Sequence, residues 1–397
     1  MRLAILVATL APYGAENAAL RLAQGFKKKG IDVTLILTDC PPAMDTNSIP
    51  VIALRQGDPL VIPKTLLYAP LQYVRLRRTC SDHQFDVIIS FMERANIFNL
   101  TLPKKHKKVL SIRTFLSASL EKDSPTLHRW LIKLTYSLAL QRSQYVVCVS
   151  RAAAMDMIDT FHLEPHQVRV MQNPLDLEAI DDKAKQPPNP THGQLLDECS
   201  ILHVGRFSPD KGQWHLIRAF SNVIESHPNA RLIFLGDGDM RPRAEKLTKQ
   251  LDVAGNVHFL GFQKNPYPFM ARCGVFACSS LWEGFPNALV EALCCGAAIV
   301  STDCRSGPRE LLAPMTDFRS VAHEIEPAQY GILTPPVDGV FRETGPLTHS
   351  ESLLAQAICR LLQDEKLRSL YRQIGPQRVE EFHTDRVVDK WMSLINS

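Results

Sequence analysis

At 397 residues, with 45% apolar and 22% charged residues, the chain has a globular composition and the length of two domains of about 200 residues each. No apolar run approaches the roughly 20 residues that span a bilayer, which argues against a transmembrane protein. The ten cysteines form no CxxC pair and no His/Cys cluster at zinc spacing, so neither a disulfide framework nor a metal site is indicated.

Charge is unevenly distributed along the chain. Residues 1–175 hold 22 Lys and Arg against 13 Asp and Glu, whereas the remainder holds 23 against 28, within a net charge of +4. The basic first half predicts an anionic partner, such as lipid headgroups, a phosphorylated acceptor or nucleic acid.

Strand-like apolar runs alternate with helical patterns from end to end, which is typical of open parallel sheets covered by helices on both faces. In the first half the predicted strands are Leu3–Ala8, Asp32–Leu37, Val87–Ser90, Val109–Ile112, Tyr145–Val149 and Arg169–Gln172. A proline-rich polar stretch, Asp182–Cys199, is the best linker candidate. In the second half the predicted strands are Ser200–Val204, Arg231–Leu235, Val257–Leu260, Val275–Cys278 and Ala298–Ser301. The sequence therefore predicts two doubly wound α/β domains in tandem, with ligands bound at the carboxyl ends of their strands, between the domains.

Glycines mark several turns that follow predicted strands. Gly14 lies in the first strand-to-helix loop, where a backbone without a side chain allows close approach to a ligand. That loop lacks G-x-G-x-x-G, which argues against an NAD enzyme. Gly236 follows a second-half strand in a common GDGD turn, and Phe262 follows the next one. Phe262 is either a core residue or a platform for a nucleobase.

The segment HVGRFSPDKG carries Arg206 and Lys211 on one loop after a strand. Arginine grips phosphate oxygens with two N–H groups and lysine supplies a mobile charge, so together they suit a diphosphate. The plainer interpretation is a pair of solvated surface cations. The loop alone leaves both interpretations open.

The most informative segment is SLWEGFPNALVEAL, in which Glu283 and Glu291 are eight residues apart. We expect Pro286 in the first helical turn, with Glu291 further along that helix and Gly296 ending it. A helix N-terminus offers N–H groups and partial positive charge to a phosphate, and flanking carboxylates can hold sugar hydroxyls. The plainer interpretation is a corner whose glutamates face water.

Taken together, these motifs resemble the retaining glycosyltransferases of family 4, which have the GT-B architecture of two Rossmann-like domains. The matching segments occur in the family's order and are YGAE, VVCVSRAAAMDMIDTFHLEPHQVRVMQNPLD, VGRFSPDKG, LGDGDM and EGFPNALVE. The resemblance implies an acceptor-side domain of residues 1–177, joined by a C-terminal helix at about 377–397, and a nucleotide-sugar domain of residues 178–376.

The resemblance also implies residue roles. Glu291 would hold the ribose, and Glu283 would act at the donor sugar. Arg206 and Lys211 would clamp the diphosphate, and Gly14 would touch it from the first domain. The other implied donor contacts are Gly236, Phe262, Phe285, Asn287 and Ala288. No metal or other cofactor is expected, and the leaving phosphate itself would assist attack on the same face of the sugar.

One position departs from the family. Many relatives carry a histidine after the Val109–Ile112 strand, where this chain has SIRTFLSAS, so we name Arg113 as the catalytic-site candidate there. His106, within KKHKK, is expected to be solvated.

The expected reaction moves a hexose or N-acetylhexosamine from a nucleotide sugar, preferably a UDP-sugar, to a glycan or polyprenyl-diphosphate-linked glycan. We expect a cytoplasmic enzyme of polysaccharide or lipopolysaccharide biosynthesis. Pro63–Arg78 combines leucines and tyrosines with a basic end and fits either an anionic membrane surface or packing on its own domain. Alternative functions are a UDP-sugar epimerase or a non-catalytic sugar-binding or nucleotide-binding protein. Nucleic-acid binding is not expected, because the basic runs lack interleaved aromatic residues.

Overall fold

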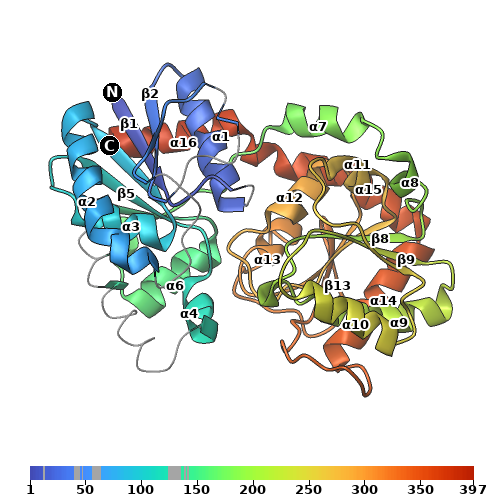
Figure 1. Cartoon of the computed structure of the whole chain (residues 1–397). Helices are drawn as coiled ribbons and strands as arrows, with labels where there is room; N and C mark the ends of the chain where they lie inside the picture. The colour runs from blue at the N-terminus through green and yellow to red at the C-terminus, as the bar shows by residue number, and fades with distance from the viewer. Residues whose placement is uncertain are drawn as a thin grey trace. The chain divides into compact units, whose positions relative to one another are not determined.

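A computed structural model describes residues 1–11, 14–39, 45–46, 48–55, 64–123, 136–137, 140 and 143–397. The chain forms two compact units (Figure 1). The first comprises Met1–Asp176 with Phe382–Ser397, and the second comprises Leu177–Glu381. The sequence placed the first boundary after residue 177 and the return near residue 377.

The described part of the first unit contains a parallel sheet in the order β3-β2-β1-β4-β5-β6-β7. Its strands are β1 (Arg2–Val7), β2 (Asp32–Leu37), β3 (Val51–Ala53), β4 (Val87–Phe91), β5 (Lys107–Ile112), β6 (Tyr145–Cys148) and β7 (Val168–Val170). Its helices include α1 (Gly14–Lys28), α2 (Lys64–His83), α3 (Met92–Thr101), α4 (Leu116–Asp123), α6 (Arg151–Phe161) and α16 (Thr384–Asn396). Alternate residues of these strands are buried on opposite faces of the sheet, as expected when helices cover both.

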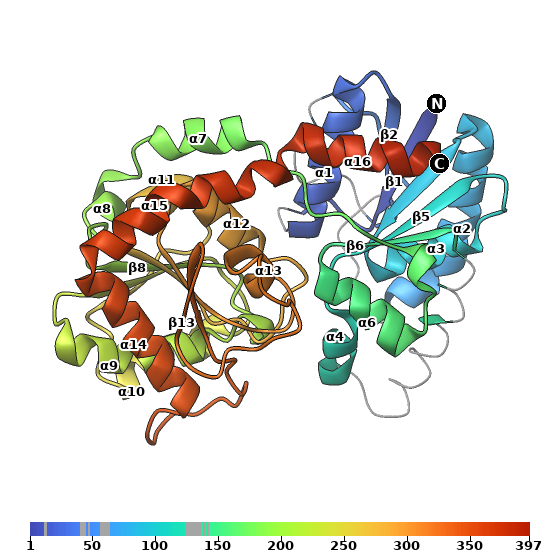
Figure 2. The ribbon, with the colours of Figure 1, turned by 180° about the vertical axis from the view of Figure 1, so that it is seen from behind.

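The C-terminal helix α16 belongs to the first unit, as the sequence predicted. Val388 of α16 packs so closely on Gly25 of α1 that a Cβ added to this glycine would lie 2.4 Å from it. Figure 2 shows the two helices beside each other. The segment by which the chain leaves the first unit pairs with the segment by which it returns. Leu175 and His383 form a parallel bridge, and Thr384 Oγ1 donates to the Leu175 carbonyl.

The second unit contains a sheet in the order β10-β9-β8-β11-β12-β14-β13, in which only the edge strand β13 is antiparallel among the described strands. The strands are β8 (Ser200–Val204), β9 (Arg231–Leu235), β10 (Val257–Phe259), β11 (Val275–Cys278), β12 (Ile299–Thr302), β13 (Glu326–Ala328) and β14 (Gly331–Thr334). The helices are α7 (Leu177–Lys185), α8 (Pro190–Gly193), α9 (Gln213–Ser226), α10 (Arg241–Gln250), α11 (Tyr267–Arg272), α12 (Asn287–Cys294), α13 (Pro308–Leu312), α14 (His349–Gln363) and α15 (Glu365–Val379).

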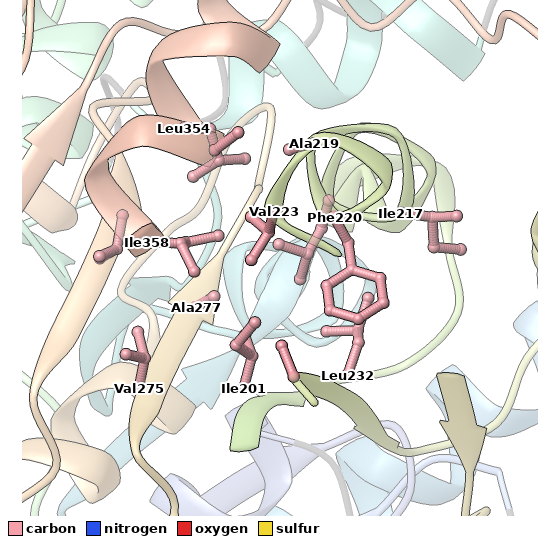
Figure 3. Close-up of a cluster of buried hydrophobic side chains, with 14 of the residues drawn as sticks. Ile201, Ile217, Ala219, Phe220, Val223, Leu232, Val275, Ala277, Leu354 and Ile358 are labelled. Carbon is pink, nitrogen blue, oxygen red and sulfur yellow. The ribbon is translucent and has the colours of Figure 1, made fainter. Parts of the chain in front are cut away.

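The core of the second unit lies between its central strands and the helices α9 and α14 (Figure 3). Ile201 and Val275 extend from β8 and β11 toward Phe220 of α9 and Ile358 of α14. Helix α14 begins at a capping box in which Thr348 and Glu351 exchange side-chain and backbone hydrogen bonds. Helix α9 is anchored in this core by its buried face, and it directly follows the loop after β8.

Most predicted strands match the structure to within a residue or two, but the linker prediction was wrong. The stretch Asp182–Cys199 lies inside the second unit, where it contains the end of α7 and all of α8. Arg272 and Asn265 donate to the carbonyls of Ala184 and Lys183 and so hold this segment in place. The units instead divide after Asp176.

Candidate active site

The direction of strand order reverses between β8 and β11 in the second unit. Strands β9 and β10 lie beyond β8, whereas β12 and β14 lie beyond β11. The loops that follow β8 and β11 therefore leave the sheet in opposite directions. In an open parallel sheet such a reversal is where ligands bind.

The loop after β8 is held against the loop after β11. Its short 3-10 helix, Pro209–Lys211, ends at Gly212, which has a φ of +56°. A Cβ on Gly212 would lie only 2.5 Å from the Ser279 carbonyl oxygen, so this contact requires glycine. The Leu281 N–H donates to the Asp210 carbonyl, and the Ser279 hydroxyl donates to the Lys211 carbonyl.

This contact brings Lys211 and Glu283 together. Lys211 Nζ lies 2.6 Å from Glu283 Oε1, and their side chains are only 23% and 11% exposed. Ser280 Oγ donates to the same carboxylate oxygen at 2.7 Å, and Asp210 lies 3.6 Å from the lysine. Burial alone would lower the pKa of Lys211, but the two carboxylates outweigh it and raise the pKa. Lys211 therefore stays charged, and it is not a solvated surface cation.

Glu283 leads into α12, which carries the other residues of the motif. The helix begins at Asn287, and Pro286 is its N-cap rather than a residue of its first turn. The Pro286 carbonyl accepts from the N–H groups of Leu289 and Val290, which ties the start of the helix. Phe285 is buried. The remaining candidates, Asn287, Ala288 and Glu291, are partly exposed on this helix.

Two glycine turns lock the loop after β8 to those after β9 and β10. The Gly236 N–H donates to the Gly261 carbonyl, and a Cβ on Gly236 would lie 2.0 Å from the Gly205 oxygen. Gly238 is also tightly packed, since a Cβ there would lie 2.4 Å from the Phe207 carbonyl oxygen. Gly236 therefore sets the position of the loop that carries Arg206 and Lys211.

Two candidates near these turns face solvent. Phe262 is 64% exposed, so it is not a core residue, and a flat ligand can lie against it. Arg206 is also exposed. The structure thus places the sequence-predicted residues of the second unit on loops and helix starts at the carboxyl edge of one sheet.

Gly14 and Arg113 belong to the first unit. Gly14 begins α1 and is exposed, while residues 12 and 13 of the same loop lie outside the described residues. Arg113 is 8% exposed and points into its own unit. It donates to Asn173 Oδ1 at 2.9 Å and lies 4.5 Å from the Phe91 ring centroid. Its role at the donor sugar stays a prediction.

Burial lowers the pKa of Arg113 to about 9. Among the described residues, its Nε and Nη2 atoms have no hydrogen-bond partner. His106 corrects another expectation, because it is 5% exposed and its Nδ1 lies 2.6 Å from the Phe85 carbonyl oxygen. It is a structural residue rather than a solvated one.

Sequence reasoning missed the polar groups that hold the site residues. Thr302 Oγ1 donates to the Ser280 carbonyl, and Ser306 Oγ donates to the Gly284 carbonyl. Between strands β8 and β11, His203 Nδ1 lies 2.9 Å from the Ala277 carbonyl oxygen. The only signal in the sequence that could have found these residues was their position near the carboxyl end of a strand.

No three His, Cys, Asp or Glu side chains in the described part of the chain gather where they could hold a metal ion. Asp237 and Asp239 of the GDGD turn are exposed, and Asp237 Oδ1 accepts from the Gly238 N–H. None of the described helices is long and apolar enough to cross a membrane.

Two family models match the chain. Residues 12–179 match Glycosyltransferase Family 4, and residues 190–317 match Glycosyl transferases group 1. An uncharacterised glycosyltransferase of Methanocaldococcus jannaschii is 28% identical over 89% of this chain and 88% of its own. A 4-alpha-N-acetylgalactosaminyltransferase of Campylobacter jejuni, acting on N-acetylgalactosamine-N,N'-diacetylbacillosaminyl-diphospho-undecaprenol, is 27% identical over 96% of this chain and 95% of its own.

Among solved structures, Anabaena HepE in complex with UDP and glucose superposes with a TM-score of 0.76. The match covers 100% of this chain and 99% of HepE, at 19% identity, and therefore concerns the fold. The two family models match parts of both units, and the named relatives cover nearly the whole chain. These matches and the two-sheet fold identify the chain as a glycosyltransferase with the GT-B fold.

Proposed function

We propose that this enzyme transfers a hexose or N-acetylhexosamine, with retention of anomeric configuration, from a UDP-sugar to a glycan or polyprenyl-diphosphate-linked glycan. The observation that carries the proposal is the Lys211–Glu283 pair at the strand reversal, with Ser280 bonded to the same oxygen. The relative that acts on a diphospho-undecaprenol glycan supports the acceptor, and the UDP complex of HepE supports the donor.

The chemistry follows from the charge that develops in the reaction. The bond between the anomeric carbon and the phosphate oxygen breaks, so negative charge grows on the leaving diphosphate while the sugar becomes positive. A fixed cation such as Lys211 and the N-terminus of α12 stabilise that charge more in the transition state than in the ground state. The acceptor hydroxyl attacks the same face of the sugar and gives its proton to the leaving phosphate oxygen.

In this proposal the remaining residues contact different parts of the donor. Glu291 holds the ribose hydroxyls, Glu283 a hydroxyl of the sugar, and Arg206 the diphosphate. The exposed ring of Phe262 supports a stacking role against the base. The proposed reaction needs no metal, because lysine, arginine and backbone N–H groups supply the positive charge.

A donor assay tests this function. The enzyme is incubated with UDP-, GDP- and ADP-sugars and membrane extract as acceptor, with and without EDTA. We expect nucleoside diphosphate release with a UDP-sugar, unchanged by EDTA, and an α-linked product by NMR when the donor is α-linked. An inverted product would refute retention, and loss of activity in EDTA would refute metal independence.

Such an acceptor is embedded in a membrane, and helix α2 offers a surface that suits it. Tyr68, Leu71 and Val74 are 44%, 48% and 62% exposed on α2, and Arg77 and Arg78 follow them on exposed positions. Apolar side chains beside arginines fit the interface of an anionic bilayer. We place the enzyme in the cytoplasm, with this face on the membrane; Pro63 lies outside the described residues.

Vesicle flotation tests the membrane contact. The wild type should float with phosphatidylglycerol vesicles at low salt, and the variant Val74→Ser/Arg77→Gln/Arg78→Gln should lose most of that binding. The control variant Arg360→Gln/Lys366→Gln also removes two positive charges, but from exposed positions of the second unit, and it should bind like the wild type. Equal loss in both variants would show that binding reflects net charge and not this face.

A further inference from the structure

Two adjacent serines after β11 hold the two partners of the ion pair. Ser279 Oγ donates to the Lys211 carbonyl at 3.1 Å, and Ser280 Oγ donates to Glu283 Oε1 at 2.7 Å. Ser280 is only 2% exposed, and its own carbonyl accepts from Thr302 Oγ1 at 2.8 Å. The backbone of Ser280 is therefore held by β12, and its side chain is almost entirely buried.

The arrangement gives the two oxygens of Glu283 different tasks. Oε1 receives both Lys211 and Ser280, whereas no hydrogen bond to Oε2 from a described residue is present. A glutamate side chain has several rotatable bonds, and ordering such a side chain on binding costs conformational entropy. With Oε1 held from two sides, that ordering is complete before a ligand arrives, and Oε2 is left to accept from it.

We propose that Ser280 is a positioning residue that fixes the Glu283 carboxylate for a hydroxyl of the donor sugar. The proposal rests on the proposed role of Glu283 at the donor. Ser280 acts through Glu283 and does not touch the donor itself. Its effect must therefore disappear when the carboxylate is absent, and it must be larger for the nucleotide sugar than for the nucleotide alone.

A double-mutant cycle tests this dependence. Ser280→Ala should lower kcat/KM for the donor by about five- to tenfold, while the Kd of UDP measured by calorimetry stays within about threefold. In a Glu283→Ala background, adding Ser280→Ala should change kcat/KM by less than about twofold. Ser221→Ala is the matched control, because it removes a serine hydroxyl bonded to the Arg218 carbonyl on α9. Equal effects of Ser280→Ala in both backgrounds would overturn the proposal.

A second measurement does not depend on the donor. Lys211 is acetylated with an N-hydroxysuccinimide ester and followed by mass spectrometry, with exposed Lys249 as the internal reference. Releasing Glu283 in Ser280→Ala should speed Lys211 acetylation by at least about threefold relative to Lys249, because the free amine becomes more abundant. An unchanged ratio refutes the positioning role. If the ratio rises but no nucleotide sugar is turned over, the proposed function fails and the positioning role stands.

Discussion

Replacing Lys211 by methionine removes the cation that faces Glu283 and keeps an unbranched side chain. Exposures of 23% and 11% leave little water around the pair, so its electrostatic effects are not fully screened. A hydrogen bond to a charged group contributes about 1.5–3 kcal/mol. Losing that interaction with the leaving diphosphate should lower kcat/KM by roughly 10- to 100-fold.

The same substitution also affects folding, and the two effects can be separated. Lys211→Met leaves the Glu283 carboxylate, at 11% exposure, without its cation, which should cost about 1–3 kcal/mol and several degrees in Tm. Adding Glu283→Gln removes the unpaired charge, so the Tm of the double variant should recover. Its kcat/KM should not recover, because neither substitution restores a cation for the diphosphate.

The assay measures nucleoside diphosphate release at subsaturating donor and thermal unfolding on the same preparations. Lys249→Met, at an exposed position of α10, controls for the loss of one lysine. Turnover close to the wild type in Lys211→Met, or recovery of kcat/KM together with Tm in the double variant, would show that Lys211 is a structural ion-pair partner only.

Three further results are expected. Glu291→Ala should raise the donor KM by at least about tenfold, or roughly 1.4 kcal/mol, with a smaller change in kcat, as kinetics and UDP calorimetry can show. Gly236→Ala should lower the free energy of unfolding by at least about 2 kcal/mol and with it the Tm, because its φ is +141° and the new Cβ would overlap the Gly205 oxygen, whereas Gly255→Ala, with nothing within 4 Å, should not. Burial lowers the pKa of His203 to about 4, so the unfolded state binds a proton first as pH falls from about 6.5. Stability should therefore be intact above pH 6.5 and fall toward pH 4, and His203→Asn should show a smaller fall in Tm between pH 7.5 and 5.

The strands of the second unit could be predicted almost to the residue because buried apolar runs end there at polar or glycine turns. Ser200–Val204, Arg231–Leu235 and Val275–Cys278 match exactly. The missed strands were short, and two of them, Val51–Ala53 and Glu326–Ala328, lie at sheet edges and are not fully buried. Their pairing partners are set by the sheet, which local sequence does not specify.

The linker candidate Asp182–Cys199 was wrong for a related reason, although the boundary predicted after residue 177 lies one residue from the observed division. Proline and polar residues indicate a turn-rich segment, but they do not tell whether neighbouring helices hold it. The division after Asp176 is instead marked by the pairing of Leu175 with His383, more than 200 residues later. Such long-range contacts leave no local pattern in the sequence.

The sequence could assign the candidate site residues to loops and helix starts after strands, but it could not give their geometry. The motif around Glu283 indicated a carboxylate before a helix, and the loop after β8 indicated a phosphate-binding cation. Their ion pair joins residues 72 positions apart and depends on Gly212 accepting close contact with Ser279. For Phe262 the sequence left a core position open, because phenylalanine is usually buried, but the structure exposes this side chain.

The charges around Lys211 limit what it can do alone. Glu283 and Asp210 both lie within 4 Å of its nitrogen, at 2.6 and 3.6 Å, so the three groups together carry a negative charge while Lys211 is protonated. A diphosphate that approached this cluster with no other cation would be repelled. Arg206 and the N-terminus of α12 can supply positive charge that balances it. Lys211 can therefore act on the diphosphate only together with these groups, which makes donor binding a joint property of both loops.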